Sequence, residues 1–274
     1  MKKLLISKLL GGAAMAIYAA AGQAGAIHDA SLFITNSLAA NDDGSTGQVN
    51  LGFTANINGT NFTQTYVNNN GNITFNNPLG NFTPSLISSG TFGPIIAPFF
   101  ADVDTRGVGS SLVTYASAPL GGHTVFGVDY INVGVFPSQP IFNSFQLLLT
   151  ERVDTGAGNF DIQFNYDRIV WEAGTASGAP SGGLGGTSAL VGYWTGASSN
   201  ATLPGSLVNG ALLDTGPAGT SLIHNSLNSN ILGQYNFQVR NGVVVPPNAV
   251  PEPSSIALLG IALLGLTVMR RKTS

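Results

Sequence analysis

Apolar and polar residues alternate along two stretches of this chain, with the period of two that predicts a β-strand having one buried face. One stretch covers residues 160–167 and the other covers residues 235–240. In the first stretch we expect the apolar side chains to face one buried layer and Asp161, Gln163 and Asp167 to point outward. The apolar positions are Phe160, Ile162, Phe164 and Tyr166 in the first stretch, and Tyr235, Phe237 and Val239 in the second.

Other stretches also predict strands. Residues 145–149 are almost wholly apolar, which predicts a strand covered on both faces. A longer strand is predicted over residues 125–136, with Gly127 and Gly134 as bulges. Strands over 51–57 and 60–67 flank Asn58-Gly59, a pair that favours a tight hairpin turn.

The predicted fold class is therefore all-β, as an antiparallel two-layer β-sandwich. Residues 27–249 contain no segment with a convincing helical period, and residues 172–188 predict a long Gly-, Ala- and Ser-rich loop. Helices are expected only at the two ends of the chain, as an N-terminal signal helix and a C-terminal transmembrane helix.

The N-terminal end predicts export. Lys2, Lys3 and Lys8 precede a run of small apolar residues, which is typical of a secretory signal peptide. Ala24-Gly25-Ala26 fits the small-residue cleavage pattern, so we expect the mature chain to begin at Ile27. Cleavage after Ala24 is the alternative, and a retained N-terminal anchor is a further one.

The C-terminal end combines a Pro-Glu-Pro signal, an apolar run and a basic tail. The apolar segment 254–269 would reach about 24 Å as a helix, against roughly 30 Å of hydrocarbon, and basic side chains at its end can extend to the interface. This arrangement resembles a PEP-CTERM sorting signal, which implies processing by the membrane protease-transpeptidase exosortase and a transient inner-membrane anchor. An anchor that is never cut is the alternative. The signal residues are Val250, Pro251, Glu252, Pro253, Arg270, Arg271 and Lys272.

These segments divide the chain into a signal peptide (1–26), an all-β domain (27–242), a linker (243–249) and a sorting segment (250–274).

Every lysine lies in the terminal signals, and residues 27–249 carry four arginines against twelve acidic residues. Such an acidic domain lacks the basic patch that binds nucleic acid. The chain has no cysteine, which excludes disulfides and thiolate metal sites.

The middle of the chain carries a second resemblance, in an ordered series of sequence blocks. Together these blocks resemble a nidogen-like (NIDO) domain over roughly residues 51–241. The resemblance implies an extracellular or cell-surface protein associated with cell–matrix adhesion. The blocks are Asn69–Phe75, Ile95–Asp104, Asn143–Leu149, Phe164–Tyr166, Ile169–Trp171, Leu190–Tyr193 and Leu203–Ser206.

Asp102 and Asp104 form the best candidate metal pair. Their spacing would let two carboxylates share a hard cation such as Ca²⁺. The alternative is that they cap a turn and contact Arg106. Residues 41–45 resemble half of a calcium loop without its downstream glutamate, and we interpret them as a solvated turn.

Evidence for catalysis is weak. His28, His123 and His224 lack metal-ligand spacing, and no serine-nucleophile elbow occurs. Glu151 and Glu172 would form a carboxylate pair only if folding brought them together. We therefore expect a non-enzymatic secreted protein that binds extracellular polysaccharide or a matrix protein, in adhesion or biofilm. The alternatives are a structural envelope component without a ligand, or a matrix glycan hydrolase.

Overall fold

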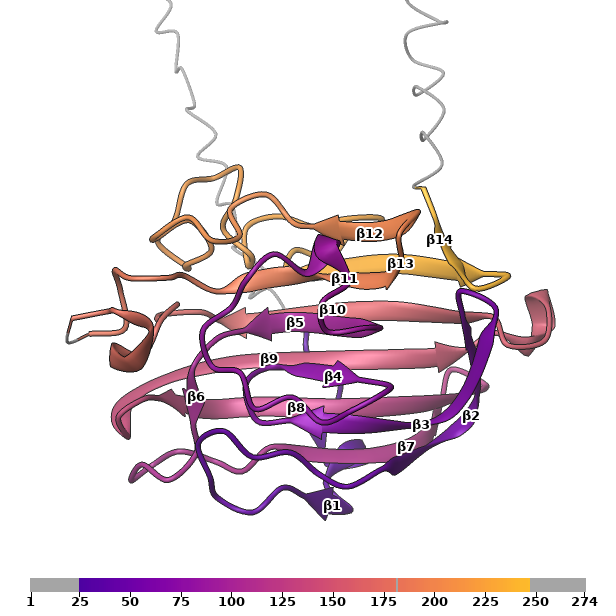
Figure 1. The fold of residues 1–274 in the computed structure, drawn as a ribbon, viewed down its shortest axis with the longest axis horizontal. Helices are drawn as coiled ribbons and strands as arrows, with labels where there is room; N and C mark the ends of the chain where they lie inside the picture. The colour runs from indigo at the N-terminus through magenta and orange to yellow at the C-terminus, as the bar shows by residue number, and fades with distance from the viewer. Residues whose placement is uncertain (1–24, 181, 247–274) are drawn as a thin grey trace, which may run out of the picture.

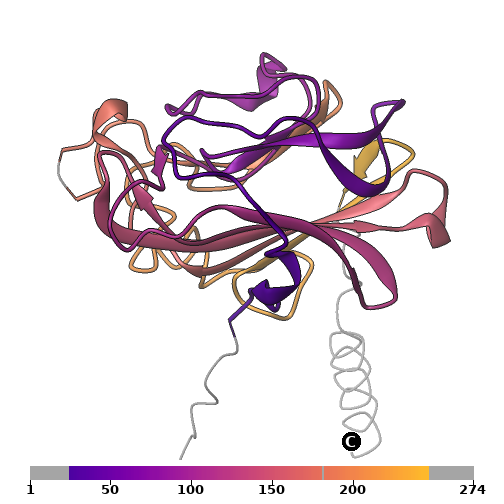
Figure 2. The ribbon, with the colours of Figure 1, turned by 90° about the horizontal axis from the view of Figure 1, so that it is seen from below.

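Two antiparallel β-sheets lie face to face and enclose the core (Figures 1 and 2). The computed structural model describes residues 25–180 and 182–246. One sheet has eight strands in the order β1-β7-β8-β9-β10-β13-β14, with β6 paired to β8. The other has six strands in the order β12-β11-β5-β4-β3-β2. The prediction of an all-β, antiparallel, two-layer fold is confirmed.

The eight-stranded sheet contains β1 (Asn36–Ser37), β6 (Val103–Asp104), β7 (Thr114–Leu120), β8 (His123–Val135), β9 (Gln139–Glu151), β10 (Phe160–Arg168), β13 (Gln234–Arg240) and β14 (Val243–Val245). The six-stranded sheet contains β2 (Val49–Ile57), β3 (Thr60–Asn68), β4 (Asn72–Thr74), β5 (Ile95–Phe100), β11 (Leu190–Gly196) and β12 (Ser199–Thr202). Short 3₁₀ helices occur at η1 (Ala30–Phe33), η2 (Ile87–Ser89), η3 (Val153–Thr155) and η4 (Thr175–Ser177).

The core lies between the sheets, and β10 is a central part of it. The side chains of Phe160, Ile162, Phe164 and Tyr166 are all buried, as predicted, while Asp167 is exposed and Asp161 and Gln163 are half-buried on the outer face. The hydroxyl of Tyr166 crosses the core and donates a hydrogen bond to the carbonyl of Pro98, 2.6 Å away in β5. Burial of each large apolar side chain stabilises the fold by roughly 1.5–3 kcal/mol.

The hairpin between β2 and β3 also forms as predicted. Ile57 pairs with Thr60, and the two residues between them, Asn58 and Gly59, have φ values of 49° and 84°. Positive φ at both positions is what the tight hairpin turn requires, because its twist matches that of the flanking strands.

The predicted bulges in β8 are half right. Gly134 lies at a register shift between β8 and β9, whereas Gly127 pairs regularly with Ala116 on one side and Leu148 on the other. Gly127 has a different role, because a Cβ there would lie 2.4 Å from the ring of Phe33. That ring, from η1, covers Leu148 on the outer face, so β9 is covered on both faces as expected.

Residues 172–188 form a long loop with only η4 in it. Within 25–180 and 182–246, no helix is both long enough and apolar enough to cross a bilayer. The predicted N-terminal signal helix and C-terminal transmembrane helix lie outside the described residues.

Candidate functional site

Three carboxylates converge at one end of the sandwich, next to the start of β9. Asp42 and Asp43 come from the loop that precedes β2, and Asp102 comes from the turn between β5 and β6. One oxygen atom of each carboxylate lies within 4.8 Å of the others. Asp102 is only 1% exposed, Asp42 is half-buried and Asp43 is exposed. We call these three residues the acidic cluster.

The turn between β3 and β4 holds the two loops of the acidic cluster together. The Asn70 side chain donates to Asp43 Oδ1 at 2.9 Å and accepts from the backbone N–H of Val103 at 2.9 Å. The neighbouring Asn69 donates to the carbonyls of Asp42 and Val103. Two of the sequence blocks that carry the family resemblance, 69–75 and 95–104, therefore meet at the acidic cluster.

Asp104, the second member of the candidate metal pair, has different partners from Asp102. Its side chain is buried and accepts hydrogen bonds from Arg106 Nε at 2.9 Å and Arg106 Nη2 at 2.8 Å. The backbone N–H and the hydroxyl of Ser138 donate to it at 2.9 and 3.0 Å. The structure thus joins Asp102 to Asp42 and Asp43, and joins Asp104 to Arg106 and Ser138.

The electrostatics of these carboxylates differ accordingly. Burial, and then the nearby charges of Asp42, Asp43 and Asp104, raise the pKa of Asp102 to about 7. Burial together with the charges of Asp104 and Asp43 raises the pKa of Asp42 to about 6, although Arg106 opposes this. Burial also acts to raise the pKa of Asp104, but hydrogen bonds from Arg106 and Ser138 outweigh it and hold that pKa below its ordinary value.

A second feature is an open groove of about 390 Å³ on the outer face of the eight-stranded sheet. Strand pairing builds its floor, because Thr150, Asp161, Gln238 and Val245 are directly opposite one another across β9, β10, β13 and β14. A second row consists of Gln163 opposite Asn236. The sequence predicted that Asp161 and Gln163 face outward, but contained no local signal that β10 pairs with β13.

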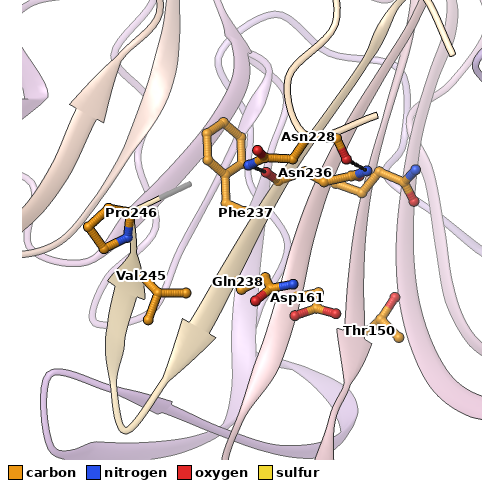
Figure 3. Close-up of a pocket in the computed structure, with 9 residues that line it drawn as sticks. Thr150, Asp161, Asn228, Asn236, Phe237, Gln238, Val245 and Pro246 are labelled. Carbon is orange, nitrogen blue, oxygen red and sulfur yellow. Dashed lines mark hydrogen bonds between the residues drawn. The ribbon is translucent and has the colours of Figure 1, made fainter. Parts of the chain in front are cut away.

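The wall of this groove is also rich in amides (Figure 3). Asn228 donates from its side chain to the carbonyl of Asn236 at 2.9 Å, and Asn236 returns a bond to the carbonyl of Asn228 at 3.1 Å. Pro246, which follows Val245, completes the lining on the other side. We call this feature the amide groove, and its donors and acceptors suit a ligand rich in hydroxyl groups.

The carboxylates considered for catalysis do not come together. Glu151 ends β9, whereas Glu172 lies beside its start, since Asn143 of β9 donates to the carbonyl of Trp171 at 2.9 Å. Glu172 is fully buried and accepts from the backbone N–H groups of Gly210 and Leu212 at 2.6 and 2.7 Å. It therefore fixes the loop that follows β12.

The candidate histidines have unrelated surroundings. The backbone N–H of His28 donates to the side chain of Gln146, and burial lowers the pKa of its imidazole. His123 begins β8. The ring of His224 lies 3.0 Å from the carbonyl of Asp214.

Of the predicted processing residues, only Ala26 and Ile27 lie in the described part of the chain. Ala26 is 5% exposed, and its methyl group lies against Gly233. Ala24 and the sorting-signal residues Val250–Pro253 and Arg270–Lys272 lie outside the described residues.

Sequence reasoning missed the contribution of Asp42 and Asp43. Residues 41–45 did show half of a calcium-loop pattern, but nothing local indicated that Asp102 would lie beside them. Their meeting depends on the return of the chain through β3, β4 and β5, which sequence spacing does not encode.

Two family models match this chain. A family model described as NIDO related matches residues 18–218, and one for the PEP-CTERM protein-sorting motif matches residues 249–272. Both resemblances inferred from the sequence are therefore confirmed. No solved structure matches this chain.

Curated relatives include alpha-tectorin from Mus musculus and from Homo sapiens, each 30% identical over 240 residues. Alpha-tectorin from Gallus gallus is 30% identical over 236 residues. Each match covers 76% of this chain but 10% of the relative, so the chain spans about a tenth of the length of these proteins.

Proposed function

We propose, because this chain belongs to the NIDO-related family and carries a PEP-CTERM sorting motif, that it is a matrix-binding adhesion protein of the cell surface. The coarser conclusion, a secreted or cell-surface protein, rests on these two matches alone. The finer proposal is that the domain binds extracellular polysaccharide or a matrix protein outside the cell.

The observation that carries the binding proposal is the amide groove. Its floor offers a carboxylate, a hydroxyl and several amides at the fixed spacings of a β-sheet, which supports recognition of a chain rich in hydroxyl groups. Such contacts contribute about 1 kcal/mol each, so we expect weak binding per domain that gains strength from many copies on one cell. The separation of Glu151 from Glu172 supports a binding role over glycan hydrolysis.

Purified matrix polysaccharide from the producing cells tests this proposal. We expect the double variant Gln163→Ala and Gln238→Ala to reduce retention on this polysaccharide about tenfold or more, because two outward amides are lost. A matched control is Gln64→Ala in β3 of the other sheet, whose amide bonds to Asn50 at 3.0 Å. Equal retention of wild type and groove variant, or release of shortened glycan by the wild type, would contradict the binding proposal.

We also propose processing at both ends, through the signal peptide and by exosortase. The burial of Ala26 against Gly233 supports a cut after Ala24, which keeps this contact, over a cut after Ala26. Intact-mass measurement of the surface form should then give a chain that starts at Gly25 and lacks Arg270–Lys272. Replacing Glu252 by Ala should leave the precursor at the inner membrane, and a surface form with its tail uncut would contradict exosortase processing.

A further inference from the structure

The acidic cluster contains buried carboxylate oxygens that have no partner. Asp102 Oδ2 and Asp42 Oδ1 are both inaccessible to solvent, and neither accepts a hydrogen bond from the described part of the chain. Buried carboxylate oxygens normally accept hydrogen bonds, because loss of their hydration is costly. Asp102 is 99% buried and offers an oxygen within 4.8 Å of oxygens from both other members of the cluster.

The positive charge beside the acidic cluster is too small to neutralise it. Arg106 lies close enough to form ion pairs, but its guanidinium binds Asp104 through two atoms and reaches Asp42 at 3.0 Å. The Arg106 guanidinium thus pairs with two carboxylates, and Asp43 and Asp102 have no ion pair with it. The sequence supplies no lysine between residues 27 and 249 to complete the balance.

The loops that carry the acidic cluster are held in place by contacts of their own. The Thr105 hydroxyl accepts from the backbone N–H of Asn41 and donates to its carbonyl, both at 2.9 Å. Asn41 Oδ1 in turn accepts from the N–H of Gly44. On the other side, Gly174 approaches Asp102 so closely that a Cβ there would lie 2.1 Å from Oδ2. The loops are thus held in place in advance, and residue 174 leaves room for the Asp102 carboxylate because it has no side chain.

We propose that Asp42, Asp43 and Asp102 bind a calcium ion, which joins the loop before β2 to the turn after β5. The ion would compensate the negative charge that Arg106 leaves unpaired, at two carboxylates that each have an oxygen without a hydrogen-bond partner. Asp104 stays with Arg106 and orients that guanidinium toward Asp42. The site lies away from the amide groove, so the calcium proposal does not depend on the proposed binding function.

The set of ligands favours calcium over other metals. All three side chains offer hard carboxylate oxygens, and neither histidine nor cysteine takes part, which disfavours zinc and copper. Calcium accepts six to eight oxygens in irregular arrangements, whereas magnesium requires near-octahedral geometry and holds its water tightly. Three carboxylates on one partly exposed site fit the weak affinities, about 10⁻⁴–10⁻³ M, of extracellular calcium modules.

Titration of the full-length protein with CaCl₂ after treatment with a chelator tests the proposal. We expect one ion per chain by calorimetry, and a rise in Tm of about 5 °C at saturating calcium, because the ion binds the folded state only. MgCl₂ should produce a clearly smaller response. Stoichiometric calcium binding absent up to about 10 mM would overturn the site, and an equal response to magnesium would overturn the choice of ion.

Three variants assign the ion to its ligands. Asp43→Asn keeps an acceptor for Asn70 and lies on an exposed residue, so the fold should survive while calcium affinity falls about tenfold or more. Asp102→Asn should abolish the calcium-dependent rise in Tm. Asp154→Asn removes the same charge from an exposed residue elsewhere and should bind calcium as the wild type does. Wild-type affinity in Asp43→Asn and Asp102→Asn alike would show that any bound calcium lies elsewhere and would overturn the assignment.

Discussion

Two clusters of charge lie at opposite ends of β9 and are built differently. Near its start lie four carboxylates, and the single guanidinium of Arg106 pairs with two of them, Asp42 and Asp104. Asp43 and Asp102 have no ion pair with it. Past its end, two guanidinium groups meet two carboxylates, and we call that group the paired cluster. Its contacts are Arg152 to Asp161 at 2.6 Å, Arg152 to Asp154 at 3.0 Å and Arg240 to Asp161 at 2.7 Å.

The two clusters differ in how far their negative charges are compensated by arginine. In the paired cluster every carboxylate contacts an arginine. Asp161 Oδ1 accepts no aligned hydrogen bond, but it lies 2.7 Å from Arg240 Nη1, so its charge is compensated. In the acidic cluster, Asp42 Oδ1 and Asp102 Oδ2 are buried with neither a hydrogen bond nor an ion pair in the described part of the chain. Uncompensated buried charge destabilises a fold, which is the reason for proposing a cation at the acidic cluster and none at the paired cluster.

The largest effect on stability is expected from Asp104→Asn, which breaks the ion pair between Asp104 and Arg106 beside the acidic cluster. Loss of the charged bonds to Arg106 and Ser138 should lower the free energy of unfolding by about 2–3 kcal/mol. Urea denaturation would measure it, and calcium should not restore the loss. A deficit below about 0.5 kcal/mol would mean that the charges of Asp104 and Arg106 are paired only weakly.

The contact of Asp104 with Arg106 and Ser138 should also make the free energy of unfolding depend on pH. Because the folded pKa of Asp104 lies below its unfolded value, its contribution is present above about pH 4 and is lost as pH falls through the folded pKa. Stability of the wild type measured against pH should therefore fall toward that of Asp104→Asn in acid.

A smaller effect is expected from Asp161→Asn, which leaves two arginines of the paired cluster short of a carboxylate. The three side chains are 16–25% exposed, so solvent screens part of the loss and we expect about 1–2 kcal/mol. Denaturation with and without calcium should give the same deficit. A deficit that calcium removes would erase the distinction between the two clusters.

The smallest effect is expected from Asp154→Asn at the rim of the paired cluster. Its side chain is 48% exposed, and exposed ion pairs contribute about 0–1 kcal/mol. We expect a change within about 0.5 kcal/mol by the same urea measurement. A loss as large as that of Asp161→Asn would show that the pair is cooperative and that exposure is a poor guide here.

The sequence predicted those parts of the fold that depend on local pattern. Alternation identified β10 and the burial of Phe164, and Asn58-Gly59 identified the β2–β3 turn, because neighbouring residues alone determine both. The glycines of β8 were harder to interpret. A glycine in a strand can mark either a bulge, as at Gly134, or a place where an aromatic ring packs against the backbone, as at Gly127. The sequence does not distinguish the two.

The candidate sites depended on contacts that no local pattern encodes. The amide groove requires β10 to pair with β13, which lies about 70 residues further along the chain. The acidic cluster requires Asp102 to face Asp42 rather than its sequence neighbour Asp104. Spacing suggested that Asp102 and Asp104 act together, but an intervening residue in β6 and the position of Arg106 separate their partners.

The edge strand β14 also has a mechanical consequence. Three residue pairs join it to β13, and the N–H of Val244 donates to Ser199 Oγ of the other sheet at 2.8 Å. Tension applied to the chain beyond Pro246 would load these few contacts first, since they open at a lower cost than the long central strands. Their rupture would release the residues of β14 and lengthen the extended chain that follows β13 by about 3.3 Å per residue. It would also remove Val245 and Pro246 from the lining of the amide groove. Under the proposed binding function, pulling force would therefore change the ligand site through one short strand.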